Sequence, residues 1–126
     1  MELPRGFSNL GERVEETALR ELGEETGKFG NSMIFIGRVN PNSAFYTTSG
    51  IPLYAAEVNP NIKSKLKPDA KEPILKCTFE PYGEVRKRIK DGQVFCGLSL
   101  AGLCLLDNYF ELEGITSRKK NGFRTF

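Results

Sequence analysis

Six glutamates and two arginines lie within one short stretch, residues 6–28. Glu21 and Glu25 are four residues apart, so on an α-helix both carboxylates project from one face, with Glu24 close beside them. Like charges at this spacing repel, and a divalent cation would compensate them, since Mg²⁺ takes carboxylate, water and phosphate oxygens. The stretch therefore indicates a cation site facing a phosphorylated substrate. A bare pair of acids at this spacing, however, more often marks only a solvated helix face.

The full spacing is more specific than a pair of acids. Five residues separate Gly6 from Glu12, seven separate Glu12 from Arg20, and residues 20–27 continue as Arg-Glu-Leu-Gly-Glu-Glu-Thr-Gly. This pattern resembles the signature of the Nudix hydrolases and matches it at every position but the last, where Lys28 replaces an aliphatic residue. The resemblance implies an α/β fold, a Nudix-type α/β/α sandwich with a mixed sheet, formed as a single domain over residues 1–126.

The resemblance also implies an activity. We expect a Mg²⁺-dependent hydrolase, with Mn²⁺ as the alternative ion, that cleaves the pyrophosphate bond of a nucleoside diphosphate linked to another moiety and releases a nucleoside monophosphate. The opening residues 1–6 resemble the ELPxG segment of the group that acts on ADP-ribose and nucleotide sugars, in which several strands come earlier. We expect those strands to be missing from this chain or supplied by another one. The alternative is a Nudix-like domain that binds or senses such ligands without hydrolysing them.

Roles for individual residues follow from the same resemblance. The expected metal ligands are the backbone carbonyl of Gly6, or of the neighbouring Arg5, and the carboxylates of Glu21, Glu24 and Glu25. The expected catalytic residues are Glu24, Glu25 and Glu72, with Glu72 as the candidate base and a solvated loop acid as its alternative role. The expected substrate-binding residues are Arg5, Asn42 and Ser43. Glu12 is expected to pair with Arg20 and so to fix the first loop on the helix.

Composition narrows the possible number of domains, binding partners and cellular location. The chain has 126 residues, 39% hydrophobic and 27% charged, which suits one globular domain. A net charge of +2 is too small to indicate a nucleic-acid or membrane surface. No apolar run is long enough to span a bilayer and no signal-peptide pattern begins the chain. We therefore expect a cytoplasmic protein that binds neither nucleic acid nor membrane. The resemblance to the Nudix hydrolases further implies a homodimer that takes a small nucleoside diphosphate substrate.

Histidine is absent, which excludes histidine bases, Ser-His and Cys-His nucleophiles and the usual zinc sites. The three cysteines, Cys77, Cys96 and Cys104, are scattered among apolar neighbours and are expected to be reduced core thiols. The basic run at residues 118–120 is expected to be part of a solvated tail rather than a binding patch.

The elements that position the acidic stretch can be placed from local patterns. A helix is predicted over residues 12–25, with Ser8 or Asn9 as its cap, Gly27 as its left-handed end and a buried stripe of Val14, Ala18 and Leu22. Strands are predicted at 33–39, 51–58 and 74–79. Further helices are predicted at 81–90 and 97–110, the second one buried on the sheet, followed by a loosely held tail over about 111–126.

Overall fold

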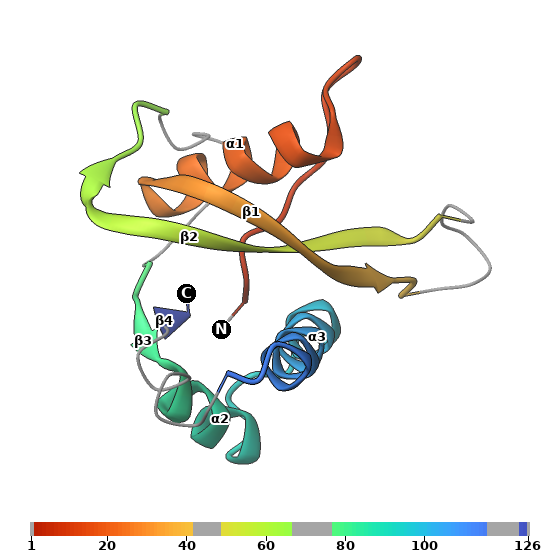
Figure 1. Ribbon diagram of the computed structural model, residues 1–126, viewed down its shortest axis with the longest axis vertical. Helices are drawn as coiled ribbons and strands as arrows, with labels where there is room; N and C mark the ends of the chain where they lie inside the picture. The colour runs from red at the N-terminus through yellow and green to blue at the C-terminus, as the bar shows by residue number, and fades with distance from the viewer. Residues whose placement is uncertain (1, 42–48, 67–76, 116–123, 126) are drawn as a thin grey trace. The chain divides into compact units, whose positions relative to one another are not determined.

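The computed structural model describes residues 2–41, 49–66, 77–115 and 124–125. The elements in chain order are α1 (Val14–Thr26), β1 (Lys28–Val39), β2 (Ile51–Lys63), β3 (Glu80–Pro81), α2 (Tyr82–Lys90), α3 (Gly97–Leu112) and β4 (Arg124–Thr125). β1 pairs with β2, and β3 pairs antiparallel with β4 (Figure 1). Helices and paired strands together confirm the expected α/β class.

The chain divides into two compact units. The first contains Met1–Leu3, Ile36–Leu53 and Thr78–Phe126, and the second contains Pro4–Phe35 and Tyr54–Cys77. The division falls between Phe35 and Ile36 in β1, and between Leu53 and Tyr54 near the start of β2. All of the acidic stretch at residues 6–28 lies in the second unit.

α1 ends as predicted but begins differently. Gly27 ends the helix with φ at 66°, a left-handed conformation that suits glycine, and its N–H donates to the Gly23 carbonyl at 3.0 Å. The residue before the first turn is Arg13, whose N–H donates to the Glu16 carboxylate at 3.0 Å. The predicted caps Ser8 and Asn9 are therefore wrong, because a carboxylate inside the helix satisfies its N-terminus and leaves both residues to the preceding loop.

The predicted stripe along α1 is also partly wrong. The buried residues are Thr17, Glu21, Leu22 and Gly23, whereas Val14 is 41% exposed. The prediction assumed that apolar side chains choose the buried face. Here part of that face is polar and acidic, and the guanidinium of Arg20 compensates the charge of Glu21.

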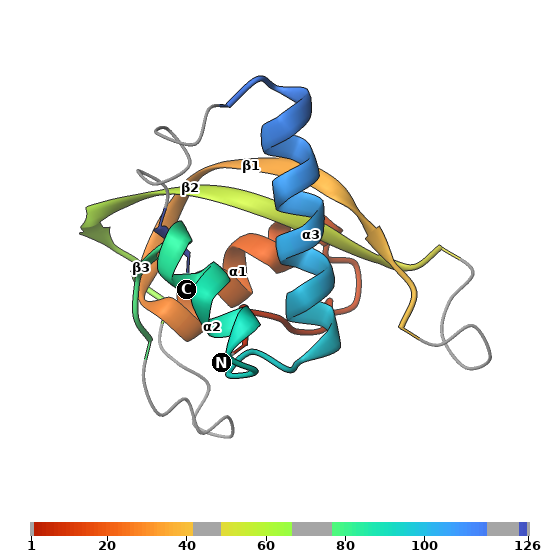
Figure 2. The same ribbon diagram turned by 90° about the horizontal axis from the view of Figure 1, so that it is seen from below.

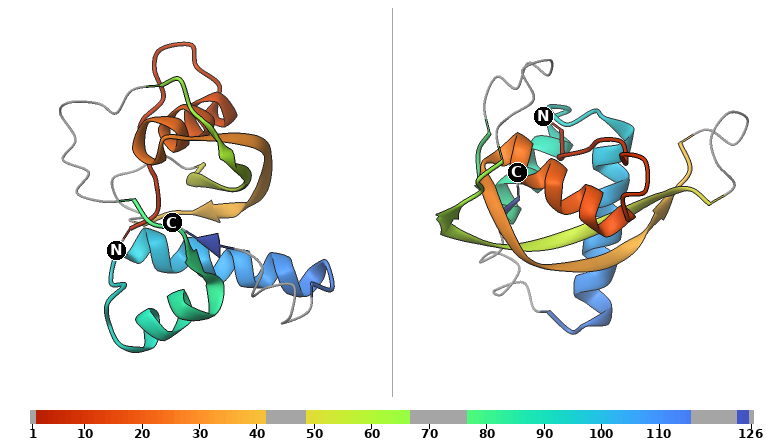
Figure 3. Two further views of the ribbon diagram at one scale, coloured as in Figure 1. Left: turned by 90° about the vertical axis from the view of Figure 1, so that its left-hand side faces the viewer. Right: turned by 90° about the horizontal axis from the view of Figure 1, so that it is seen from above.

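The strands beside α1 are longer than predicted. β1 begins directly after Gly27 rather than at Met33, and β2 continues past Val58 to Lys63. Figure 3 shows α1 lying along the first part of β1 and the last part of β2. A Cβ on Gly30 would lie 3.0 Å from the side chains of Leu19 and Leu22, so the helix packs closely on the strand there. The extensions lack an alternating apolar pattern, so they give no strand signal in the sequence.

The core of the first unit lies between α2 and α3 (Figure 2). It consists of Tyr82, Val85, Val94, Leu103 and Phe110. The Tyr82 and Phe110 rings meet edge to face, with centroids 5.7 Å apart. α2 runs over the predicted residues, although Pro81 precedes its first turn instead of belonging to it.

α3 confirms the predicted helix but not its full burial. It presents one buried stripe, Ser99, Gly102, Leu103 and Phe110, while Leu112 is 77% exposed. Within this unit the α3 side chain of Leu105 lies against β1, 2.9 Å from where a Cβ on Gly37 would stand.

The cysteines and the C-terminal segment correct two further expectations. All three cysteines are free, as predicted, but Cys77 and Cys104 are exposed and Cys96 is half-buried, so they are not core thiols. Cys104 is exposed on α3, and the apolar sequence of this helix did not tell which of its stripes would be covered. Of the predicted tail, residues 111–112 continue α3 and Arg124–Thr125 pair with β3. Residues 116–123, with the basic run at 118–120, lie outside the described part.

The predicted strand at 74–79 is not found where it can be checked. Residues 74–76 lie outside the described ranges, and residues 77–79 are irregular, so that pairing begins only at Glu80. No helix in the part of the chain that the structure describes is both long enough and apolar enough to cross a membrane.

Candidate active site

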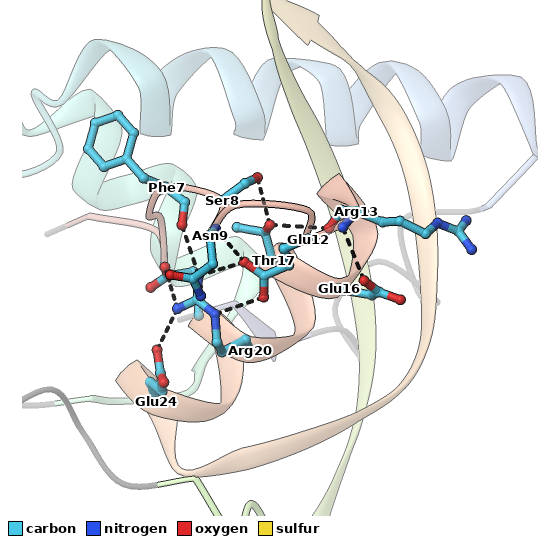
Figure 4. A network of polar contacts seen from close by, with 10 residues as sticks. Phe7, Ser8, Asn9, Glu12, Arg13, Glu16, Thr17, Arg20 and Glu24 are labelled. Atoms are coloured by element: carbon cyan, nitrogen blue, oxygen red, sulfur yellow. Dashed lines mark hydrogen bonds and ion pairs between the residues drawn. The ribbon is translucent and has the colours of Figure 1, made fainter.

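The side chain of Arg20 is the centre of a polar network that joins α1 to the loop before it (Figure 4). Nε donates to Glu12 Oε1 at 2.9 Å, and Nη2 donates to Glu12 Oε2 at 3.1 Å and to the Phe7 carbonyl at 2.8 Å. Nη1 donates to Glu21 Oε1 and Glu24 Oε2, each at 2.8 Å. A guanidinium has five N–H donors, and all five are used here.

This network confirms the predicted pairing of Glu12 with Arg20. The hydrogen bonds from Arg20, followed by the one from the Asn9 N–H, lower the pKa of Glu12 to about 2. The same bonds raise the pKa of Arg20, with Glu12 as the largest cause. Sequence reasoning missed that Arg20 also bridges two predicted metal ligands. The spacing of four residues between Arg20 and Glu24 was the available signal.

The first loop bends back onto the acidic face of α1. A Cβ on Gly6 would overlap the carboxylate of Glu21, so only glycine allows the backbone and the carboxylate to lie so close. The next residue toward the N-terminus, Arg5, donates its backbone N–H to Glu25 Oε1 at 3.3 Å. Two predicted metal ligands from α1 therefore contact consecutive residues of the loop.

Further hydrogen bonds hold the loop in this position. The Asn9 N–H donates to Glu12 Oε2 at 2.8 Å. The Thr17 hydroxyl donates to Ser8 Oγ at 2.7 Å, and Thr17 is 7% exposed. The loop is thus closed on itself at Glu12 and joined to α1 at Thr17 and Arg20, and these contacts together set the position of Gly6.

The residues present suit a hard divalent cation by their chemistry. Three carboxylates, Glu21, Glu24 and Glu25, lie on consecutive turns, and the missing Cβ of Gly6 leaves space in which the loop backbone meets one of them. Within residues 2–41, 49–66, 77–115 and 124–125, no three acidic or cysteine side chains gather tightly enough to hold an ion. Arg20 instead holds Glu21 and Glu24, so a cation binding here competes with that guanidinium.

Three predicted site residues cannot be placed. Asn42, Ser43 and Glu72 lie outside the described residues. Arg5 is exposed, and its backbone N–H donates to Glu25. The described site is therefore the first loop and α1.

Sequence reasoning also missed the contact that ties the first turn of α1 to β2. The Tyr54 hydroxyl donates to Glu15 Oε1 at 3.1 Å, and the Tyr54 ring meets Phe35 edge to face at 5.7 Å. These residues are 39 positions apart in the chain, so no local pattern could reveal the bond.

Comparison with known proteins supports the same assignment. The NUDIX domain family matches residues 1–95, the segment that contains the whole loop and helix described above. The chain belongs to the Nudix family.

One curated relative also matches this Nudix chain. This relative is the "Putative mutator protein MutT4" of Mycobacterium tuberculosis (strain CDC 1551 / Oshkosh), to which the chain is 47% identical over 38 residues. The match covers 30% of this chain and 15% of that protein. No solved structure matches.

Proposed function

We propose that this chain is a Mg²⁺-dependent hydrolase that cleaves the pyrophosphate bond of a nucleoside diphosphate linked to a sugar-like moiety, as in ADP-ribose or a nucleotide sugar. The observation that carries the proposal is the contact of the first loop with α1. Glu21 lies against Gly6, and Glu25 accepts the backbone N–H of Arg5. The carboxylates of the helix thereby lie against the loop backbone, whose carbonyl oxygen is the further ligand in this proposal.

The proposed ligands are the Gly6 carbonyl and the carboxylates of Glu21, Glu24 and Glu25, with Mn²⁺ as an alternative to Mg²⁺. When bound, the ion supplies neutralisation of the diphosphate charge and acidification of the attacking water. Arg20 keeps Glu21 and Glu24 turned toward the loop, and the loop contacts fix Gly6. Positioning and electrostatics, rather than a covalent intermediate, carry the rate in this proposal.

The proposed reaction is a substitution at phosphorus. A bond forms between a water oxygen and one phosphorus, and the bond from that phosphorus to the bridging oxygen breaks. The products are a nucleoside monophosphate and the phosphorylated partner. The water proton passes to the carboxylate of Glu72, which is the proposed base. Glu24 and Glu25 are the other proposed catalytic residues. Arg5, Asn42 and Ser43 are proposed to contact the substrate.

We also propose that residues 1–126 act as one Nudix domain within a cytoplasmic homodimer. In support, the boundary between the two compact units cuts through the paired strands β1 and β2, which a domain boundary would normally avoid. One cooperative unfolding transition, followed by both near-UV and far-UV circular dichroism, is expected. Two separate transitions would contradict a single domain, and sedimentation equilibrium tests the dimer.

A second candidate is a Nudix-like domain that binds such ligands without hydrolysing them. The observation that favours it is the engagement of both Glu21 and Glu24 by Arg20, which leaves no ready group of three ligands among the described residues. In this case Arg20 would stay on the carboxylates when the nucleotide binds.

One experiment separates the two candidates. The purified chain is incubated with Mg²⁺ and a panel of ADP-ribose, NADH, GDP-mannose and dinucleoside polyphosphates, and nucleoside monophosphate is measured by chromatography. Release that stops with EDTA and returns with Mg²⁺ supports the hydrolase. Calorimetric binding without release, including in a chain extended upstream, supports the binding domain.

Matched variants then test the metal ligands. Glu25→Gln should lose most of the release, whereas Glu57→Gln, on the exposed side of β2, should keep it. If Glu25→Gln hydrolyses as fast as the parent, the assignment of Glu25 as a ligand is wrong even though the chain is a hydrolase.

A further inference from the structure

A concave cavity lies between α2 and α3 in the first unit. Its volume is about 370 Å³, within the range of small-molecule sites, and its lining residues are Arg86, Ile89, Lys90, Leu100, Leu103, Cys104 and Asp107. All of them belong to two helices that lie side by side (Figure 2). None of them has a place in the proposed hydrolysis.

The apolar part of the lining comes from both helices. Ile89 of α2 faces Leu100, Leu103 and the exposed thiol of Cys104 on α3 across the cavity. Leu103 is buried and Ile89 and Leu100 are half-buried, so only part of this apolar wall is open to solvent; that part gains free energy when an apolar body displaces water from it. A ligand for this cavity therefore needs an apolar part.

The charged part of the lining is basic. α2 carries four cations, two of which are paired. Lys87 pairs with Glu84 at 2.7 Å and Arg88 pairs with Glu80 at 2.6 Å. Arg86 and Lys90 form no ion pair with any described residue, and they are the two cations that line the cavity. Because they are four residues apart, both project from the same face of the helix.

The one acid in the lining does not cancel them. The carboxylate of Asp107 is hydrogen-bonded to the Tyr82 hydroxyl, so one of its acceptor positions is used toward the core rather than toward the two cations. Two exposed cations against one engaged carboxylate leave an excess positive charge at an apolar cavity. The chain's own residues 116–123, TSRKKNGF, carry only positive charge and do not complement it.

We propose that the cavity between α2 and α3 binds a small molecule with an anionic head group, a carboxylate or phosphate, on an apolar body. The apolar body contacts Ile89, Leu100 and Leu103, and the head group pairs with Arg86 and Lys90. Because it involves only residues of the first unit, this binding does not depend on the proposed hydrolysis.

Calorimetric titration with decanoate tests the class of ligand. Decanol has the same body without the charge, and acetate has the charge without the body. Decanoate is expected to bind at least about tenfold more tightly than either, since each removes one of the two contributions. Equal affinity for decanoate and decanol would overturn the anionic part of the proposal, and no binding of decanoate would overturn it altogether.

Two double variants test the location. Arg86→Gln with Lys90→Gln removes the cations that line the cavity, and Lys87→Gln with Arg88→Gln removes the same charge from the paired positions on the same helix. The first is expected to weaken decanoate binding about tenfold, and the second less than about twofold. Equal weakening would show a general effect of net charge and would overturn the site.

Alkylation of the exposed thiols provides a readout independent of these variants. Decanoate is expected to slow the reaction of Cys104 with iodoacetamide severalfold, measured by peptide mass mapping, and to leave Cys77 unchanged. Equal rates at Cys104 with and without decanoate would place the ligand elsewhere.

Discussion

Glu12 and Arg20 form a two-point ion pair, with Nε 2.9 Å from Oε1 and Nη2 3.1 Å from Oε2. Their side chains are only 14% and 22% exposed, so solvent screens the pair less than it would at the open surface. Because Arg20 Nη2 also holds the Phe7 carbonyl, the pair fixes the loop that carries Gly6. The position of the proposed metal site therefore depends on a contact that is not itself a ligand.

Acid is expected to weaken the fold through Glu12. Hydrogen bonds from Arg20 lower its pKa from 4.5 to about 2, so the folded state favours the ionised form. Its contribution to stability is then complete above pH 4.5 and is lost as the pH falls toward 2. Glu12→Gln should therefore be less stable at neutral pH and lose less stability across that window, measured by urea unfolding. Glu57→Gln should keep the parent's acid dependence; the same dependence in Glu12→Gln would contradict the prediction.

Replacement of Arg20 by lysine should destabilise the second unit although the charge is kept. An ammonium has three donors and no planar fork, so it cannot satisfy Glu12, Glu21, Glu24 and the loop carbonyl together. We expect a loss of about 1–3 kcal/mol in the free energy of unfolding. Arg13→Lys is the matched control, because that side chain is 74% exposed. A loss in Arg20→Lys no larger than in Arg13→Lys would show that the network contributes little.

Gly6→Ala should disrupt the proposed site directly. The added methyl would overlap the Glu21 carboxylate and must move either that side chain or the loop. A displacement of this size is expected to lower nucleotide hydrolysis by about a hundredfold. Gly97→Ala, where a Cβ meets nothing within 4 Å, should retain activity. Full activity in Gly6→Ala would mean that the close approach of loop and carboxylate is not needed.

The packing of α1 against the residues just after β2 predicts that an alanine at Gly23 will lower the stability of the chain, although alanine normally stabilises a helix. A Cβ there would lie 2.7 Å from Ser64 Oγ and 2.9 Å from Leu66 Cδ1, at a cost of about 1–3 kcal/mol. That cost outweighs the gain of about 1 kcal/mol in helix propensity, so Gly23→Ala should destabilise the chain. In a background with both Ser64→Ala and Leu66→Ala the same change should be neutral or stabilising, since both close contacts are then removed. Identical effects in both backgrounds, measured by thermal unfolding, would contradict this packing.

The core of the first unit should depend strongly on Phe110. This side chain is 1% exposed and packs edge to face on Tyr82. Phe110→Ala is expected to cost about 3–5 kcal/mol in the free energy of unfolding, through lost burial and the cavity that remains. Leu112→Ala, on the same helix but 77% exposed, should change stability by less than about 0.5 kcal/mol. Comparable losses in the two variants would place the core elsewhere.

Local patterns predicted most of the helices and part of the site. The end of α1 at Gly27 and the pairing of Glu12 with Arg20 agree with the sequence-based expectation, and the bounds of α2 and α3 agree with it to within two residues. Each depends on residues close in the chain or on the spacing of the Nudix motif. Strand lengths were less predictable, since the extension of β1 to Lys28 rests on backbone pairing with a distant partner.

The sequence by itself determined the family, through the spacing from Gly6 to Gly27, and it determined which oxygen-bearing side chains share one helix. Only the tertiary structure decided that Glu21 is buried while Val14 is exposed, that Cys104 faces outward, and that Tyr54 holds Glu15. The physical reason is that periodicity specifies the angle of a side chain around its own helix. Which face becomes covered depends on groups brought in from elsewhere in the chain.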